Sequence, residues 1–508
     1  MRAIWGRLTS KDAPAFLWWL WIGLGIVLRL RQYAANRSFW QDEACLALNL
    51  VNRTFGGLTR PLDYEQGAPV AFLFIEKSIM VMLGNKDYIL RLFPLISGIL
   101  AIYLLYRIAR EYFGMTGMLA VLMFSISSTL ILYSSELKQY SSDGMVALLL
   151  IVLSLPRMGK SVRGGDFLLL GGAGIFAIWI SHPSTFILAG IGLVMVFERF
   201  LRKDYPSLAW LLGVGGVWLA ALGAEYFFSL RYLVADSYLQ FYWRKAFLPL
   251  PPWENLGWFV KTYYSFLLMS LGRTDWILSL MFLTLAGIGI VSLLARNWKV
   301  ALVVILPFFM VSVASALHKY PLKDRFMLFL VPLGLLLMAE GVGRIYHFLV
   351  RWNRTSALIV SGVLVLLIFY LPASTTFQSF KWPLMTEHIK PVLDYVKDHR
   401  APSDVVYVYH GAMPAFDYYA PFYALDSGDV IIGAFETNNK IALQNFFEDV
   451  KNLDGRSRVW LIFSHIVDCG GCDGDPKAFY IQYLDSLGTM LDQFHVAGAD
   501  AYLYNLAP

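Results

Sequence analysis

Long apolar runs, separated by short polar loops, constrain this chain more than any other feature of its sequence. Each run approaches the ~20 residues that a membrane-crossing helix needs. The chain is 57% hydrophobic and 15% charged, whereas soluble domains have about 25% charged residues. We therefore expect a polytopic α-helical membrane protein with about eleven spans. The expected spans are Ala15–Leu30, 91–108, 116–134, 143–156, 166–181, 184–199, 207–228, 275–294, 300–317, 326–345 and 356–372.

Basic residues in alternate short loops predict the orientation of these spans. Cytoplasmic loops are rich in Lys and Arg, so we expect the N-terminus to lie in the cytoplasm. We expect the membrane to be the inner membrane of the cell. An odd number of spans then sends the C-terminal region to the extracytoplasmic side. The loops that we assign to the cytoplasm contain Arg107 and Arg110; Arg157, Lys160 and Arg163; Arg199, Arg202 and Lys203; Arg296 and Lys299; Arg344, Arg351 and Arg354.

The composition divides the chain into a membrane domain, 1–375, and an extracytoplasmic domain, 376–508. A first outer loop, 31–90, has two amphipathic stretches, and an aromatic outer loop covers 229–274. In the second domain, helical patterns alternate with β-rich runs, which is typical of a small α/β domain. The expected helices are Glu43–Asn52 and Val70–Leu83 in the first loop, and Glu387–His399, Ile441–Leu453 and Lys477–Leu487 in the second domain; the expected strands are Val405–Tyr409, Val430–Ile432, Val459–Phe463 and Ala501–Tyr504.

The cysteines and the net charge indicate less about the fold than the apolar runs do. Cys45 stands alone, while Cys469 and Cys472 form a Cys-Gly-Gly-Cys segment for which a local disulfide is expected outside the cytoplasm. A redox-active pair is the alternative. The net charge of +6 resides mainly in short loops between spans. No basic track interleaved with exposed aromatics is present, so nucleic acid is not an expected partner.

Two adjacent carboxylates, Asp42 and Glu43, follow the first span directly. Carboxylates at that depth are costly unless they are used. We interpret them as part of a reaction centre in which Asp42 is the catalytic base. The alternative is an ordinary loop in which Asp42 caps a helix that begins at Glu43.

Further polar clusters fall at the same predicted membrane face. A carboxylate there can take the proton of an acceptor hydroxyl, and cations can hold a phosphate leaving group. The pair Asp42 and Asp143 could also bind a divalent metal ion. Each of these residues also has an ordinary structural interpretation. Glu136, Lys138 and Asp143 could pair with one another in water, or Asp143 could be a helix N-terminal acid. Lys323 and Arg325 could be interfacial anchors, and His182 could make a local hydrogen bond. The candidate catalytic residues are Asp42, Glu43 and Asp143; the candidate substrate-binding residues are Glu136, Lys138, Tyr140, Gln66, His182, Lys323 and Arg325.

Three segments carry a family resemblance: Trp40–Ala44, Gln66–Pro69 and the YSSELKQYSSD run at Tyr133–Asp143. They resemble motifs of the dolichyl-phosphate-mannose protein mannosyltransferase superfamily, and most closely those of its prokaryotic glycosyltransferases with the GT-C fold. The resemblance covers about residues 15–350. It implies a polyprenyl-phosphate sugar donor, a protein, lipid or glycan acceptor, inversion at the anomeric carbon, and chemistry at the extracytoplasmic face among membrane lipids.

The resemblance also implies roles for individual residues. Asp42 matches the first-loop acid that acts as base, and Glu136, Lys138 and Asp143 match the second acidic outer turn. Related aminoarabinose transferases have a Lys in the loop that here reads Glu65-Gln66-Gly67, so another cation must hold the phosphate. Lys138, Lys323 and Arg325 are the candidates.

Two other functions compete with single-sugar transfer. A transporter or lipid flippase would have charges near span centres, broken helices and inverted repeats. The sequence has no evident repeat, and its charges fall at span ends. An oligosaccharyltransferase-like or polymerising enzyme would use a longer lipid-linked glycan.

Overall fold

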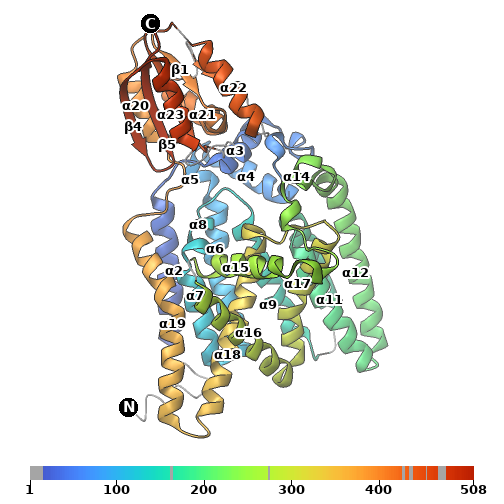
Figure 1. Cartoon of the computed structure of the whole chain (residues 1–508). Coiled ribbons are helices and arrows are strands. Elements are labelled where there is room, and N and C mark those ends of the chain that lie inside the picture. Colours follow the sequence, from blue (N-terminus) through green and yellow to red (C-terminus); the bar gives the residue numbers. More distant parts are fainter. Residues whose placement is uncertain are drawn as a thin grey trace. The chain divides into compact units, whose positions relative to one another are not determined.

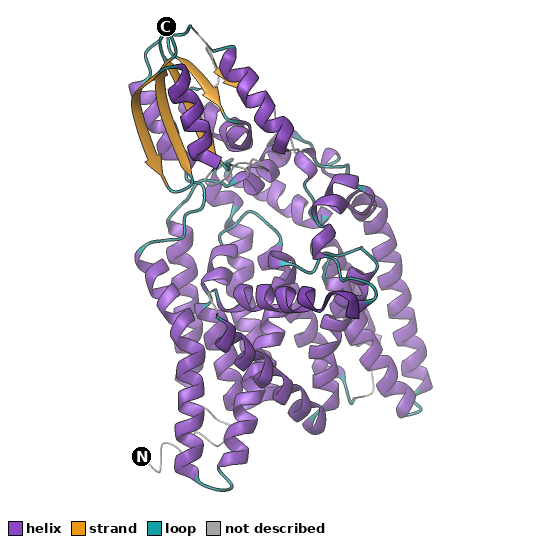
Figure 2. Cartoon of the chain, in the orientation of Figure 1, coloured by secondary structure: helices purple, strands orange, loops and turns teal. Residues whose placement is uncertain are grey.

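A computed structural model of the chain describes residues 15–160, 164–272, 275–425, 430–433, 439–453, 455–466 and 476–507. They form two compact units, and we treat each unit by itself. The membrane unit consists of the described residues of Met1–Ala35, Phe55–Pro61 and Gly67–Pro383; the C-terminal unit consists of those of Asn36–Thr54, Leu62–Gln66 and Leu384–Pro508. Figure 2 shows that the first is helical and that the second carries the sheet.

Helices build the membrane unit, and the predicted spans all fall on them. Among the described residues, eight helical stretches are long and apolar enough to cross a membrane. α10 is a shorter apolar helix. The count of about eleven crossings stays a prediction. The main helices are α2 (Ala15–Ala34), α4 (Val70–Leu83), α6 (Leu92–Ile108), α7 (Gly117–Ile126), α8 (Ser128–Tyr133), α9 (Tyr140–Ser154), α10 (Gly164–Ile180), α11 (Ser184–Leu201), α12 (Tyr205–Glu225), α15 (Leu256–Leu271), α16 (Trp276–Arg296), α17 (Trp298–Ala316), α18 (Val331–Leu349) and α19 (Arg354–Lys381).

The core of this unit is packed around α18. The stretch Asp324–Leu349 is 94% buried over its most apolar window, whereas Arg354–Lys381 is only 17% buried. Close packing explains the glycines on the facing helices, because small residues let helix backbones approach. A Cβ on Gly289 of α16 would lie 1.9 Å from the carbonyl oxygen of Leu337, and one on Gly341 would lie 1.9 Å from that of Leu285.

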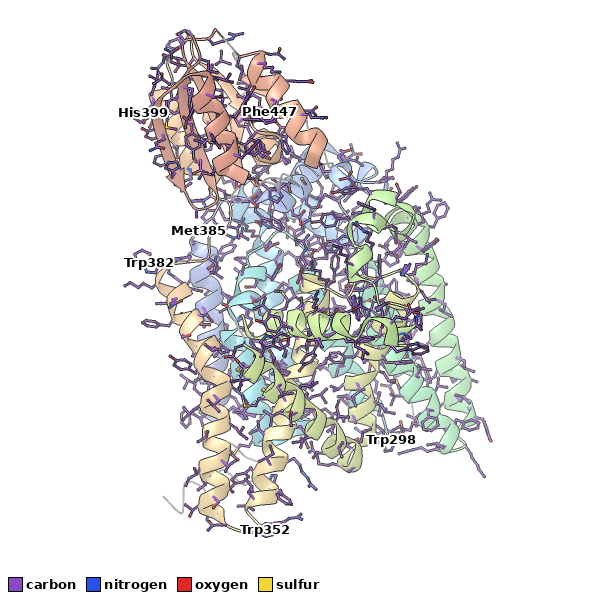
Figure 3. All side chains as sticks on the ribbon, viewed as in Figure 1. Trp298, Trp352, Trp382, Met385, His399 and Phe447 are labelled. Carbon is purple, nitrogen blue, oxygen red and sulfur yellow. The ribbon has the colours of Figure 1, made fainter. Side chains whose placement is uncertain are left out.

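The loops sort to the two ends of the membrane unit as expected. Trp352 and Trp298 lie at one end of the unit, and Trp382 lies at the other end of α19 (Figure 3). Loops predicted to be cytoplasmic contact one another: Lys299 pairs with Glu198 at 2.7 Å. Arg202 Nη1 donates to the carbonyl of Gly159 at 2.8 Å. Aromatic side chains at both ends are typical of membrane interfaces.

The C-terminal unit contains a mixed sheet, of which Figure 1 labels β1, β4 and β5. Its five strands have the order β2-β1-β3-β5-β4. β1 pairs in parallel with β2 and β3, while β5 is antiparallel to β3 and β4. The small α/β domain is therefore confirmed. Its elements are α20 (Ile389–His399), β1 (Val405–Val408), α21 (Met413–Tyr423), β2 (Val430–Ile432), α22 (Asn439–Lys451), β3 (Val459–Ser464), α23 (Pro476–Leu487), β4 (Thr489–Val496) and β5 (Ala499–Asn505).

Two elements of this unit were not predicted, and both omissions have a physical reason. β4 has one half-buried face and one exposed face, so its sequence lacks the apolar run of a buried strand. α21 contains Pro414 and Pro421, which a sequence pattern counts against a helix. Cys469 and Cys472 lie outside the described residues.

Part of the first outer loop belongs to the C-terminal unit. Helix α3 (Gln41–Asn52) and the short 3-10 turn η2 (Asp63–Glu65) fall in segments that cluster with the residues after Leu384. Phe39, which precedes α3, is fully buried against the ring of Tyr418, with centroids 5.0 Å apart. The two predicted helices of this loop are confirmed, because α4 occupies Val70–Leu83 and α3 begins two residues before Glu43.

Candidate functional site

Two of the predicted polar clusters meet at one end of the membrane unit. The acid turn, residues 133–143, joins α8 to α9, and the cationic corner, residues 318–325, precedes α18. The guanidinium of Arg325 lies 5.7 Å from the ring centroid of Tyr140. The ring of Phe326 lies 6.2 Å from that of Tyr140. Residues nearly 200 positions apart in the sequence thus converge.

The charged groups of the acid turn are almost entirely enclosed. Glu136, Lys138 and Asp143 are 3%, 5% and 5% exposed. Burying charged groups is costly unless they are paired or used, and this turn contains both signs of charge. Burial also raises the pKa of Tyr320 well above its usual range, and the nearby Asp143 raises it further. The charged groups of the acid turn are therefore buried and have little access to water.

The aromatic outer loop packs against the cationic corner. Trp243 and Phe326 make an edge-to-face contact with centroids 5.0 Å apart. The amide of Leu322 donates to the carbonyl of Ala246 at 2.9 Å. His318 and Asp324 have φ values of 55° and 45°, a left-handed conformation that is uncommon outside glycine and that clusters at functional sites.

A remaining piece of the first outer loop completes the same region. Gln139 Nε2 donates to the carbonyl oxygen of Gly67 at 3.3 Å. Ser229 Oγ donates to that of Ala68 at 3.4 Å. A side chain at Gly67 would lie 2.6 Å from Leu233, so glycine permits this close approach. The acid turn, the 67–69 segment and the start of the aromatic loop are thus in contact.

Arg231 is a candidate that the sequence analysis missed. Its guanidinium lies 4.1 Å from the ring centroid of Phe227 and 4.5 Å from that of Tyr232. Its buried Nε has no hydrogen-bond partner, and the described residues place no carboxylate in an ion pair with it. A cation held by aromatic faces keeps its charge available to an anion. A lone Arg flanked by aromatic residues was the available sequence signal.

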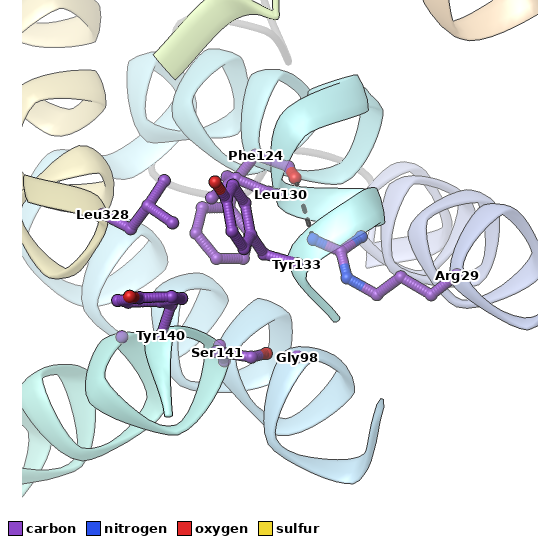
Figure 4. A pocket seen from close by; sticks show the side chains of 10 residues that line it. Arg29, Gly98, Phe124, Leu130, Tyr133, Tyr140, Ser141 and Leu328 are labelled. Atoms are coloured by element: carbon purple, nitrogen blue, oxygen red, sulfur yellow. Dashed lines mark hydrogen bonds between the residues drawn. The ribbon is translucent and has the colours of Figure 1, made fainter. Parts of the chain in front are cut away.

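Arg29 lies near the acid turn and binds the C-terminal end of α7. This fully buried side chain of α2 donates to the carbonyl oxygens of Phe124 and Ser125 at 3.1 and 3.3 Å. Those carbonyls belong to the C-terminal turn of α7, which lacks intrahelical partners. Figure 4 shows Arg29 beside a small cavity of about 20 Å³, which is lined also by Tyr133 and Tyr140. That volume suffices for one or two water molecules.

His182 and Lys323 have partners of their own. His182 Nε2 lies 3.1 Å from Oε1 of Glu225, which is fully buried. This local bond is the alternative that the sequence left open for His182. Lys323 is 54% exposed and lies 3.8 Å from Asp324, a separation at which an exposed pair contributes little.

Asp42 and Glu43 lie in the C-terminal unit and have opposite environments. α3 begins at Gln41 with Trp40 as its N-cap, so the alternative that Asp42 caps a helix starting at Glu43 is wrong. Asp42 is partly exposed in the first turn. Glu43 is fully buried, and its Oε2 lies 2.8 Å from Nη1 of Arg37. The burial of Glu43 favours a structural role over the predicted catalytic one.

The segment that contains Gln66 is also held in an unusual conformation. Tyr64 and Glu65 have φ values of 60° and 52°, and two consecutive bulky residues in this region are rare. Gln66 Nε2 donates to the carbonyl of Tyr64 at 3.1 Å. Burial raises the pKa of Tyr64, and the charge of Asp417 adds to this. Backbone strain of this kind is typical of functional loops.

The described residues contain no group of three or more His, Cys, Asp or Glu side chains that could hold a metal ion. The two acids that we considered as a metal pair, Asp42 and Asp143, belong to different units.

Comparisons with known proteins agree with this architecture. Residues 66–220 match the sequence profile of the dolichyl-phosphate-mannose-protein mannosyltransferase family. No curated protein matches the sequence significantly. The crystal structure of ArnT from Cupriavidus metallidurans bound to undecaprenyl phosphate has a TM-score of 0.55 and 12% identity, with 97% of this chain and 98% of that chain covered. The apo structure of the same protein has a TM-score of 0.51 and 13% identity, with coverages of 96% and 97%.

The profile match and the structural likeness cover different lengths of the chain, and both agree with the same architecture. Apart from Gln66, the profile match lies within the membrane unit, and it includes the acid turn. The structural likeness extends over nearly the whole chain. The chain therefore has the multi-pass GT-C fold that the ArnT structures show, and residues 66–220 are similar to the protein mannosyltransferase family.

Proposed function

We propose that this protein transfers a sugar from a polyprenyl-phosphate donor to an acceptor hydroxyl, with inversion at the anomeric carbon, at the extracytoplasmic face of the cell membrane. The observation that carries the proposal is the convergence of the acid turn and the cationic corner in the membrane unit, where Arg325 lies over Tyr140. The fold shared with a protein that was crystallised with undecaprenyl phosphate supports the donor class.

The reaction is a single displacement. The acceptor oxygen attacks the anomeric carbon while its proton passes to the carboxylate of Asp42, the proposed general base. The bond between the anomeric carbon and the phosphate oxygen breaks, and the polyprenyl phosphate leaves with the electron pair. Attack from the face opposite the leaving group inverts the configuration.

Cations of the membrane unit hold the departing phosphate. Lys138 is nearly buried in the acid turn, Arg325 faces Tyr140, and Arg231 lies between two aromatic rings. Positive charges in a site with little water stabilise a developing anion more than they would in solution. Lys323 is the weakest of the predicted candidates because it is exposed.

A lipid-linked donor also follows from the location that we propose. Nucleotide sugars are cytoplasmic, whereas a lipid donor presents its head group at the outer membrane surface while its tail stays in the bilayer. The aromatic loop, which packs on the cationic corner, suits such an interface because Trp and Tyr combine apolar and polar surface.

The test is product analysis with the purified full-length protein in lipid nanodiscs. A polyprenyl-phosphate sugar is supplied with a protein, lipid or glycan acceptor, and both products are identified by mass spectrometry and nuclear magnetic resonance. We expect one sugar added per acceptor, free polyprenyl phosphate, and the opposite anomeric configuration. Addition of many sugars at once would indicate the glycan-transferring alternative. Movement of intact donor across a bilayer without sugar transfer would contradict the proposal and indicate a flippase.

A further inference from the structure

The C-terminal unit contains a group of hydrogen bonds that the proposed reaction does not use. They join the backbone immediately before Asp42 to side chains of the domain that begins at Leu384. The amide of Gln41 donates to Oε2 of Glu387 at 2.9 Å. The amide of Phe39 donates to the hydroxyl oxygen of Tyr419 at 2.8 Å. The two acceptors lie 346 and 380 residues further along the chain.

Glu387 provides a hydrogen-bond acceptor at the N-terminus of helix α3. The first amides of a helix have no intrahelical acceptor, and the N-cap residue Trp40 provides no side-chain bond. The carboxylate of Glu387 accepts from the first of these amides, and a negative charge is favourable at this end of the helix dipole. Its other oxygen lies 2.8 Å from Nδ1 of His465. Glu387 is therefore itself held in place.

Ser38 forms a second attachment just before α3. Its Oγ lies 2.9 Å from Nδ1 of His388 and accepts from the amide of Lys390 at 3.0 Å. Lys390 Nζ donates in turn to the carbonyl of Asn36 at 2.6 Å. Residues 36–41 are thus fixed by backbone and side-chain bonds from the C-terminal domain. Asp42 follows directly in the chain.

We propose that Glu387 and Tyr419 are positioning residues for Asp42, through which the C-terminal domain sets the location and direction of this carboxylate. The inference rests on the proposed function, in which Asp42 is the general base. Neither residue needs to touch substrate, because both act through the backbone of residues 39–41. Catalysis is sensitive to such placement: a displacement of about 1 Å can cost about 100-fold in rate.

The test compares Tyr419→Phe and Glu387→Ala with wild type in the full-length protein. The matched control is Tyr395→Phe, which removes a hydroxyl in the same domain that donates to Asp492 at 2.9 Å. Turnover and donor KM are measured in nanodiscs, and amide hydrogen exchange is measured over residues 38–44. We expect kcat to fall about 10- to 100-fold with donor KM unchanged, and exchange at Phe39 and Gln41 to become faster. Tyr395→Phe should match wild type in all three.

Glu387→Gln separates positioning from a general loss of folding. Its amide oxygen still accepts from the Gln41 amide, so we expect this variant to retain most of the activity that Glu387→Ala loses. Equal losses in Tyr395→Phe and Tyr419→Phe would overturn the inference, as would wild-type kcat in both test variants.

Asp42→Asn, assayed alongside, distinguishes the two proposals. Full activity of Asp42→Asn contradicts the proposed function. An inactive Asp42→Asn protein, together with fully active Glu387→Ala and Tyr419→Phe proteins, contradicts only the positioning role.

Discussion

The first turn of α3 and the acid turn of the membrane unit contain the same kinds of residue but use them differently. In the first, adjacent carboxylates are separated by environment: Asp42 is partly exposed, whereas Glu43 is fully buried against Arg37. In the second, Glu136, Lys138 and Asp143 are all nearly buried within one turn. Adjacent acids in a motif therefore need not share a role, because burial and the nearest cation decide what each can do.

The different environments of Asp42 and Glu43 indicate different roles for the two acids. A fully buried carboxylate paired with a cation stabilises the fold only while both partners are present. A partly exposed carboxylate in the first turn of a helix can still receive a proton from a substrate. We therefore expect Glu43 to hold the segment together and Asp42 to act chemically.

The largest expected effect comes from removing the partner of Glu43. Arg37→Met leaves a buried carboxylate without its cation, and we expect it to reduce the free energy of unfolding by about 3–5 kcal/mol. The double variant Arg37→Met/Glu43→Leu should recover most of this loss, because it removes both charges. Chemical denaturation in detergent provides the measurement. A single variant as stable as wild type would show that the pair is not structural.

A smaller effect, on donor KM, is expected to differ between two cations of the cationic corner. Arg325→Gln removes a charge that faces the acid turn, whereas Lys323→Gln removes an exposed one. A hydrogen bond to a charged group contributes about 1.5–3 kcal/mol, so we expect donor KM to rise about 10- to 100-fold in Arg325→Gln. Lys323→Gln should change it less than twofold, given the weakness of exposed pairs. Equal effects of the two variants would contradict the assignment.

A pH-dependent effect concerns Glu76, a buried acid that differs from Glu43 because no described residue forms a hydrogen bond with either of its carboxylate oxygens. Burial raises its pKa well above the usual range, so the folded state binds a proton more tightly than the unfolded state does. Stability from this group is present below about pH 4.3 and is lost as the pH rises toward the folded pKa, by at most about 1.4 kcal/mol per pH unit.

Glu76→Gln removes the titrating group and should flatten this dependence. The melting temperature of the two proteins, measured from pH 4 to pH 8, checks it. A wild-type melting temperature that rises with pH while that of Glu76→Gln stays flat would have the wrong sign for a carboxyl with a raised pKa.

The fold could be predicted from the sequence wherever a single local pattern determines an element. α4 follows Pro69 and ends at Gly84, which has a φ of 102°, so both bounds were readable. β2 was likewise predicted to the residue. β4 was missed because its sequence lacks the continuous apolar run of a buried strand, and α21 because of its two prolines.

Long-range contacts explain why the site was only partly predictable. Topology placed the acid turn and the cationic corner at one membrane face, and the contact of Arg325 with Tyr140 agrees with this. No sequence pattern indicated that Glu387 would accept from the Gln41 amide, because the cap lies 346 residues from its helix. The position of Arg231 between two aromatic rings likewise depends on the folded aromatic loop.

The most direct test of the central claim is the rate of sugar transfer by Asp42→Asn. Wild type, Asp42→Asn and the control Asp394→Asn, an exposed acid of α20, are compared in nanodiscs with saturating polyprenyl-phosphate sugar and acceptor. Loss of a general base typically costs about 10²- to 10⁴-fold. We therefore predict at least a ~100-fold fall in turnover for Asp42→Asn, with unchanged melting temperature, and wild-type turnover for Asp394→Asn. Turnover of Asp42→Asn at the wild-type rate would contradict the account.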